Sequence, residues 1–154
     1  MSKIATGSKA PPFTLAGTGG EWSLQDAAGR NVVMYFYPRD NTSGCTKEGV
    51  AFGASFAKFR KANTIIVGIS ADSLESHVKF KEKMGFPFDL LSDPDRKVCK
   101  SYDVIQEKSM YGRKFLGIER STFLIDAKGV LRSEWRKVKV DGHAEAVLAA
   151  VTAL

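Results

Sequence analysis

The sequence has little of what marks secreted or membrane-spanning proteins. Only two of its 154 residues are cysteines, Cys45 and Cys99, which is too few for a disulfide scaffold and fits a reducing compartment. No apolar run approaches the roughly 18 residues that a membrane span needs. Residues 1–10 contain two lysines but no hydrophobic stretch behind them. We therefore expect a cytoplasmic protein with no export signal and no membrane association.

Metal-ligating and phosphate-binding patterns are also scarce. Neither histidine, His77 or His143, has a cysteine or second histidine at ligand spacing. A His-Ala-Glu run at residue 143 resembles the start of a zinc-deaminase signature, but no Pro-Cys-x-x-Cys follows it. The glycines between residues 17 and 20 miss the spacing of phosphate-binding loops and precede no convincing helix. We expect no metal and no cofactor, and place His143 in the first turn of the last helix.

Positive charge is in excess and lies mostly late in the chain. The formal net charge is +6. Residues 113–139 contain eight basic side chains and only three acidic ones. The basic residues are Arg113, Lys114, Arg120, Lys128, Arg132, Arg136, Lys137 and Lys139, and the acidic ones are Glu119, Asp126 and Glu134. A nucleic-acid interface would add aromatic stacking residues or a reading helix, whereas this region is typical of two strands and a turn. We expect solvated strand faces and no nucleic-acid partner.

The composition and order of elements predict one folded domain over residues 1–154. Apolar residues make up 44% and charged residues 26% of the chain, which excludes the signature of disorder. The expected elements, in chain order, are short extended pieces at 13–15 and 21–24 that form a hairpin, a buried strand at 31–37, a helix at 45–62, a strand at 64–70, a helix at 72–84, a short extended piece at 87–91, a helix at 93–102, strands at 121–126 and 130–139, and a helix at 141–154. This alternation predicts an α/β fold of the thioredoxin-like kind, a mixed central sheet flanked by helices.

Cys45 lies where a thiol is easily ionised. It falls in the first turn of the expected helix after a buried strand, beside free backbone N–H groups and the positive end of the helix dipole. Both favour the thiolate. Spacings of four, three, four and three place five residues on one helix face: Cys45, Gly49, Phe52, Phe56 and Phe59. The sulfur is therefore expected at the floor of a small pocket beneath residues 38–44.

Two residues of that turn can shape the pocket. Pro38 can keep water and backbone donors from one side, and the hydroxyl of Thr42 can hydrogen-bond to a small oxygen-containing substrate. Thr42 could equally serve as a helix cap, and Pro38 as a strand terminator. A buried thiolate also needs a counter-charge, and a guanidinium is suited to this, but the residue pattern alone does not say which arginine supplies it.

A known family carries the same motif. Residues 38–46 read Pro-Arg-Asp-Asn-Thr-Ser-Gly-Cys-Thr. This closely resembles the active-site signature of peroxiredoxins, namely proline, three residues, threonine, two residues and cysteine, and in particular the bacterioferritin-comigratory or Q-type subfamily. Further matching segments lie at 68–73, 86–88, 91–94, 110–112 and 120–126. The resemblance covers nearly the whole chain.

The resemblance implies roles for four residues. Cys45 is similar to the peroxidatic cysteine, and Pro38 and Thr42 to the residues that shape and polarise the peroxide pocket. Arg120 is similar to the arginine that holds thiolate and peroxide. The implied mechanism is in-line attack of the Cys45 thiolate on a peroxide oxygen, which leaves a sulfenic acid and releases water or an alcohol.

The chain departs from the subfamily at the resolving cysteine. Many members carry it five residues after the peroxidatic one, where this chain has Val50, and others carry it in the helix expected at 72–84, which contains none. Cys99 could resolve Cys45 by a disulfide if a helix or turn unwound. Alternatively, Cys99 is a small buried residue, and glutathione, glutaredoxin or thioredoxin reduces the sulfenic acid.

Other functions remain open beside a peroxidase. A disulfide reductase is disfavoured because it would need Cys-x-x-Cys at the helix start. A thiol-based peroxide sensor would oxidise Cys45 without turnover. Aromatic residues around the site leave room for organic hydroperoxides as well as hydrogen peroxide: Tyr35, Phe36, Tyr37 and Phe123. The subfamily resemblance suggests a monomer.

Overall fold

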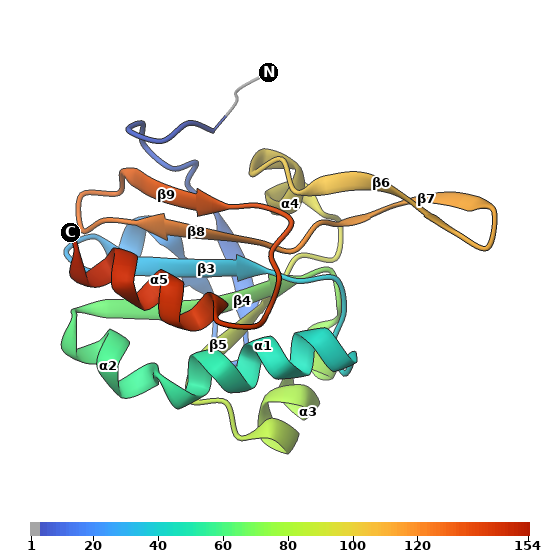
Figure 1. The fold of residues 1–154 in the computed structure, drawn as a ribbon, viewed down its shortest axis with the longest axis horizontal. Coiled ribbons are helices and arrows are strands. Elements are labelled where there is room, and N and C mark those ends of the chain that lie inside the picture. The colour runs from blue at the N-terminus through green and yellow to red at the C-terminus, as the bar shows by residue number, and fades with distance from the viewer. Residues whose placement is uncertain (1–3) are drawn as a thin grey trace.

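The computed structural model describes residues 4–154, and a seven-stranded mixed sheet forms its centre (Figure 1). The start of the 1–10 stretch, where we expected no export signal, lies outside the described residues. The strand order is β2-β1-β5-β4-β3-β8-β9. The strands of this sheet are β1 (Thr14–Gly17), β2 (Trp22–Ser23), β3 (Asn31–Phe36), β4 (Thr64–Ser70), β5 (Asp89–Ser92), β8 (Ser121–Ile125) and β9 (Leu131–Trp135).

Helices connect these strands, and a separate hairpin adds a second sheet. The helices are the 3-10 helix η1 (Leu24–Ala27), α1 (Ser43–Ala54), α2 (Phe56–Lys61), α3 (Leu74–Met84), α4 (Lys97–Ser101) and α5 (His143–Thr152). The hairpin consists of β6 (Ile105–Met110) and β7 (Arg113–Ile118). Among residues 4–154, no helix has the length and apolar character needed to cross a bilayer.

Strand β3 is an interior strand of the sheet and the element that leads to Cys45. It pairs in parallel with β4 and antiparallel with β8, so it is hydrogen-bonded along both edges. Residues 32–37 are all buried, as a continuous apolar run in an interior strand requires. At its carboxyl end the chain passes through residues 38–42 into α1.

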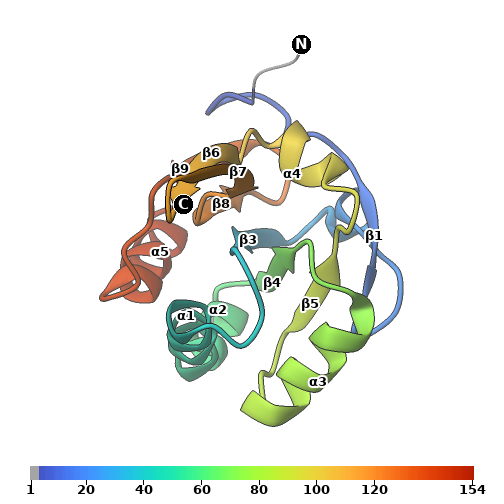
Figure 2. The ribbon, with the colours of Figure 1, turned by 90° about the vertical axis from the view of Figure 1, so that its right-hand side faces the viewer.

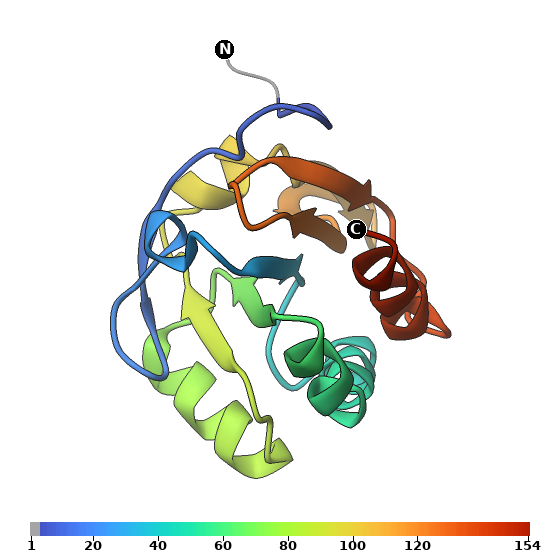
Figure 3. The ribbon, with the colours of Figure 1, turned by 90° about the vertical axis from the view of Figure 1, so that its left-hand side faces the viewer.

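Alternate residues of β3 point into two separate hydrophobic clusters, one on each face of the sheet. Met34 and Phe36 belong to one cluster, which η1 and α4 cover. Tyr35 belongs to the other, to which α1, α2, α3 and α5 contribute. Figures 2 and 3 show this division, with α4 on one side of the sheet and α1, α2, α3 and α5 on the other. The predicted mixed sheet with helices on both faces is confirmed, as is the hairpin of β1 and β2.

Three predicted elements differ in extent. The helix expected at 45–62 is two helices, because hydrogen bonding at Ser55 shifts to an acceptor three residues back. Helix α4 is shorter than the helix expected at 93–102. The Asp93 carboxylate accepts the N–H groups of Val98 and Cys99, which the carbonyls of a preceding helical turn would otherwise accept. The strand expected at 130–139 ends at Trp135, since Lys137 has a φ of 49°.

The hairpin of β6 and β7 was missed by the sequence analysis. It projects away from the main sheet in Figure 1. Its turn residues Tyr111 and Gly112 both have positive φ, 53° and 76°, as the tightest hairpin turns require. Its strands are largely exposed and polar, so they lack the apolar alternation that identifies a strand.

Candidate active site

Cys45 lies in the first turn of α1, as predicted. The helix is capped by Thr42 and begins at Ser43, and its first backbone bond runs from the Thr46 N–H to the Thr42 carbonyl at 2.9 Å. Cys45 is only 1% exposed and packs in the same hydrophobic cluster as Tyr35 and Phe52. Its thiol therefore combines a buried setting with the positive end of a helix.

Arg120 supplies the counter-charge at this sulfur. It immediately precedes β8, and its Nη2 atom donates to the Cys45 Sγ at 3.4 Å. A Cβ on Gly44 would lie 3.0 Å from the same Nη2, so the absence of a side chain there lets the guanidinium approach the helix. Residues 75 positions apart in the sequence are thus brought into contact by the pairing of β3 with β8.

Glu48 is a member of the site that the sequence analysis did not find. The Arg120 Nη1 donates to its Oε1 at 2.7 Å, and its side chain is 1% exposed. Its Oε2 has no hydrogen-bond partner among residues 4–154. The signal was present, because Glu48 lies three positions after Cys45 and therefore on the same face of α1.

At the pair of Glu48 and Arg120, burial and the charge of the partner shift each pKa in opposite directions. Burial raises the pKa of Glu48 to about 7, although the charge and hydrogen bond of Arg120 pull it down. Burial would by itself lower the pKa of Arg120, but Glu48 and Cys45 outweigh it and raise that pKa. Arg120 therefore stays charged, whereas Glu48 exchanges a proton near neutral pH.

Thr42 and Pro38 both lie in the turn that leads to Cys45. Thr42 occupies the cap position of α1, but its side chain makes no capping bond and its Oγ1 donates to the Arg39 carbonyl at 3.0 Å. Pro38 is half-buried directly after Tyr37. Of the four predicted site residues, the structure places Cys45 and Arg120 in direct contact and the other two on the adjoining turn.

Cys99 lies on the far side of the sheet from Cys45. It is fully buried in the cluster that contains Met34 and Phe36, whereas Cys45 belongs to the opposite cluster. Both cysteines are free thiols. Burial raises the pKa of Cys99, and the neighbouring Asp93 raises it further. The sheet therefore separates the two sulfurs, and Cys99 is held as an un-ionised thiol.

The two histidines are buried in separate settings. His143 begins α5, as predicted, and its Nε2 lies 2.7 Å from the Thr122 Oγ1. Burial, with the charge of Arg120, lowers its pKa to about 4. His77 lies close to Asp40 and Asp72, but both of its ring nitrogens and both carboxylate oxygens of Asp40 are already hydrogen-bonded within the protein. This group is a hydrogen-bonded cluster rather than a metal site.

Comparison with known proteins decides the family. The model of the AhpC/TSA family matches residues 6–134. The chain belongs to the AhpC/TSA family. Within it, the chain is 52% identical over 142 residues to Peroxiredoxin Bcp of Xanthomonas campestris, covering 92% of this chain and 88% of the relative. The peroxiredoxin resemblance drawn from the sequence is confirmed, and the chain is a thiol-dependent peroxidase.

Solved structures of the family share the fold. That of Xylella fastidiosa PrxQ has a TM-score of 0.93 and 41% identity, covering 99% of this chain and 98% of that one. That of the bacterioferritin comigratory protein of Xanthomonas campestris, studied for its alkyl peroxide reduction activity, has a TM-score of 0.88 and 51% identity, covering 92% and 90%. The thioredoxin-like fold predicted from the sequence is thereby confirmed.

Proposed function

We propose that Cys45 is the peroxidatic thiolate and that Arg120 holds both this thiolate and the peroxide. The observation that supports this most strongly is the 3.4 Å contact between the Arg120 Nη2 and the Cys45 Sγ in the first turn of α1. A cation and a helix N-terminus at one buried sulfur both favour the charged, nucleophilic form. The second thiol, Cys99, also lies in a first helical turn and near Arg96, but burial and the neighbouring Asp93 raise its pKa.

The reaction follows from these groups. The Cys45 thiolate attacks one oxygen of the peroxide, the O–O bond breaks, and a sulfenic acid forms. The departing oxygen takes up a proton and leaves as water or an alcohol. Arg120 and the free N–H groups of the first helical turn stabilise its charge as it develops. Because the Thr42 hydroxyl donates its hydrogen to the Arg39 carbonyl, its oxygen is left to accept a hydrogen bond from the peroxide.

Hydrogen peroxide and organic hydroperoxides, including alkyl ones, are the proposed substrates. Tyr35 and Tyr37 share the hydrophobic cluster of Cys45, and the related Xanthomonas campestris protein reduces alkyl peroxides. Two other aromatic residues expected beside the site, Phe36 and Phe123, lie in the cluster on the opposite face of the sheet. The proposal of organic hydroperoxides therefore rests on the related protein and on the apolar cluster of Cys45, in which Tyr35 and Tyr37 are each 1% exposed.

An external thiol is the proposed reductant of the sulfenic acid, with glutathione, glutaredoxin and thioredoxin as candidates. The separation of Cys45 from Cys99 by the sheet supports this over an internal disulfide. Two free thiols also fit a cytoplasmic location. We further propose that the chain acts as a monomer without a nucleic-acid partner.

Intact-mass analysis after treatment with hydrogen peroxide tests this function. Wild type and Cys99→Ser should each gain one oxygen, and Cys45→Ser should gain none. Added glutathione or dithiothreitol should then restore the thiol and sustain turnover of hydrogen peroxide and cumene hydroperoxide.

Each alternative has its own signature in the same experiment. Loss of two hydrogens in wild type, but not in Cys99→Ser, would establish an internal disulfide and overturn the external thiol. Oxidation of Cys45 that no thiol can turn over would instead favour a peroxide sensor. An unreactive Cys45 would contradict the proposed thiolate.

A further inference from the structure

The loop between β3 and α1 is fixed to the rest of the molecule at one residue, Asp40. Asp40 is 5% exposed although it lies in a connecting turn. Its backbone N–H donates to the Asp72 Oδ2 at 2.8 Å, and Asp72 in turn accepts from the Ser70 hydroxyl at 2.6 Å. The next residue, Asn41, has a φ of 64°, so the chain reverses sharply there before entering α1.

The Asp40 side chain is held by three side chains, one that directly follows β3 and two from α3. The Tyr37 hydroxyl donates to its Oδ1 at 2.6 Å. The Ser76 hydroxyl, from α3, donates to its Oδ2 at 2.8 Å, and the His77 Nδ1 lies 2.7 Å from the same oxygen. The loop that carries Pro38 and Thr42 is thereby attached to α3.

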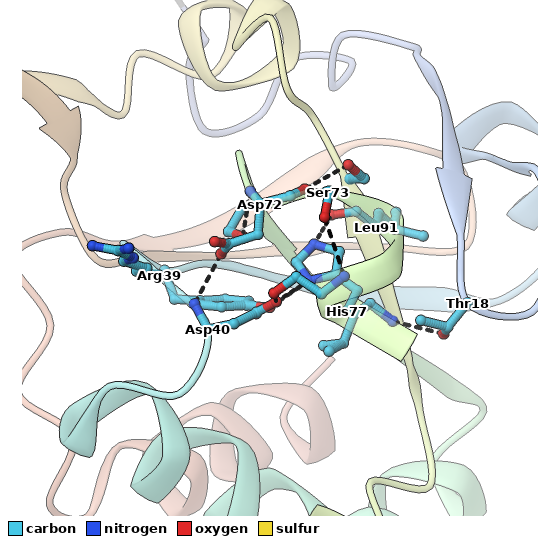
Figure 4. Close-up of polar contacts among 12 residues, drawn as sticks. Thr18, Arg39, Asp40, Asp72, Ser73, His77 and Leu91 are labelled. Carbon is cyan, nitrogen blue, oxygen red and sulfur yellow. Dashed lines mark hydrogen bonds and ion pairs between the residues drawn. The ribbon is translucent and has the colours of Figure 1, made fainter. Parts of the chain in front are cut away.

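The second ring nitrogen of His77 attaches the loop to strand β5. It is fully buried, and its Nε2 lies 2.9 Å from the Leu91 carbonyl of β5. Figure 4 shows the imidazole between Asp40 and Leu91, with Asp72 beside the loop. The His77 ring thus connects the 38–42 loop, through Asp40, to strand β5.

The hydrogen-bond partners determine where the protons lie. A backbone carbonyl can only accept, so the His77 Nε2 carries a proton. Hydrogen bonds from His77 and Tyr37 outweigh burial and lower the pKa of Asp40. The 2.7 Å contact between the His77 Nδ1 and the Asp40 Oδ2 needs one further proton, which the two groups share. Asp72 and Tyr37 are the other titratable groups that face this pair.

We propose that the buried, hydrogen-bonded pair of Asp40 and His77 is a positioning device that holds the 38–42 loop in the geometry in which Cys45 attacks peroxide. This inference rests on the proposed role of Cys45 as the peroxidatic thiolate. His77 is a positioning residue rather than a catalytic one, because it reaches the site only through Asp40. Displacement of reacting groups by about 1 Å can reduce a rate by about a hundredfold, so the loop anchor has a large effect on attack.

The contacts of Asp40 and His77 also hinder the second half-reaction, in which a thiol reduces the oxidised Cys45. Cys45 is only 1% exposed, so a thiol reaches an oxidised Cys45 more readily when the loop moves aside. Loosening the pair should therefore slow oxidation of Cys45 while leaving its reduction unchanged or faster. A general loss of folding would slow both.

The test measures the two half-reactions separately, with hydrogen peroxide as oxidant and dithiothreitol as reductant. In Asp40→Asn and His77→Leu, oxidation should slow by about tenfold to a hundredfold, with no loss in the rate of reduction. His77→Gln, which keeps one N–H donor, should recover part of the oxidation rate. Val151→Ala, which removes buried atoms of the same hydrophobic cluster from α5, should leave both rates unchanged while lowering the melting temperature.

Nuclear magnetic resonance of the wild-type protein gives a readout that does not depend on folded variants. The His77 Nε2 proton, held by the Leu91 carbonyl, should be observed at neutral pH as a slowly exchanging ring N–H. Absence of this signal, oxidation at the wild-type rate in all three variants, or an equal slowing of both half-reactions would overturn the proposal. A wild-type protein that hydrogen peroxide does not oxidise at Cys45 would instead refute the proposed function itself.

Discussion

At the scale of single residues, the site is a row of three charged or ionisable groups with Arg120 at its centre. The Arg120 Nη2 donates to the Cys45 Sγ at 3.4 Å, and its Nη1 donates to the Glu48 Oε1 at 2.7 Å. Only a forked, permanently charged side chain can donate in both directions at once. Glu48 thereby fixes the orientation in which Arg120 meets the sulfur.

Glu48 should make the stability of the protein depend on pH in the near-neutral range. Its folded pKa of about 7 lies above the ordinary value of 4.5, so it stabilises the fold below pH 4.5 and this contribution is lost as pH rises to 7. The loss should be about 3 kcal/mol at most, because each pKa unit corresponds to about 1.4 kcal/mol. Relative to wild type, Glu48→Gln should therefore gain up to this amount of stability as pH rises from 4.5 to 7, as measured by urea unfolding across that range.

His143 serves as the control for that measurement. Its pKa of about 4 lies below the ordinary 6.5, so its contribution is lost as pH falls from 6.5 to 4, the opposite direction to Glu48. His143→Gln should therefore remove a loss of stability on the acid side. If Glu48→Gln kept the wild-type slope between pH 4.5 and 7, Glu48 would not be the group that titrates there.

At the scale of elements, α1 must approach its neighbours closely in order to present Cys45. A Cβ on Gly49 would lie 2.4 Å from the Phe86 Cζ, a distance that real Cβ atoms do not show. Phe86 packs edge-on against Phe80 and is stacked on Phe88, so it cannot simply turn away. Gly49, one turn after Cys45, therefore sets how closely α1 lies against the segment between α3 and β5.

Gly49→Ala should displace α1 and slow the oxidation of Cys45. Overpacking of this kind costs about 1–3 kcal/mol, and a stopped-flow measurement with hydrogen peroxide should show the slower reaction. Gly53→Ala is the matched control in the same helix, because its Cβ would meet the Pro87 Cδ at an ordinary 3.4 Å. It should leave the rate unchanged. Equal effects of the two substitutions would contradict this account of the packing.

The sequence predicted those elements whose pattern is decided locally. The apolar runs of β3 and β4 and the start of α1 beside Cys45 are examples, since continuous burial and helix onset leave a signature in neighbouring residues. The polar hairpin of β6 and β7 has no such signature. The helix expected at 72–84 begins only at Leu74, with Ser73 as its cap, because Asp72 is turned towards Asp40 instead.

The site itself was only partly predictable, for the same reason. Cys45, Thr42 and Pro38 lie within one short motif, and Arg120 came from the family resemblance. Glu48 and His77 acquire their roles from residues 72 and 37 positions away in the chain, Arg120 and Asp40. Only the folded sheet brings those partners together, so neither local spacing nor composition could indicate the contacts.

At the scale of the whole molecule, the sheet separates two hydrophobic clusters, and each contacts one of the two tryptophans. Trp22 packs against the cluster on the side of α4, and Trp135 against the cluster on the side of α1. If residues 1–154 form one domain, as we expect, the two clusters should be lost together, because β3 contributes to both.

Single-tryptophan variants can test this cooperativity. In Trp22→Phe and in Trp135→Phe, the urea midpoint from the remaining tryptophan should coincide with the midpoint from far-ultraviolet circular dichroism. Each comparison is made within one variant, so a change in stability does not affect it. Separate midpoints in either variant would mean that the two faces of the sheet unfold independently.

The position of the sheet between Cys45 and Cys99 also affects how such a protein would meet a sudden excess of oxidant. If an outside thiol reduces Cys45, as we propose, each molecule takes up one peroxide and then waits for that reductant. During a burst that outruns the supply of small thiols, the quantity of peroxide removed would equal the quantity of protein present. Abundance, rather than catalytic speed, would then determine how large a burst the cell absorbs.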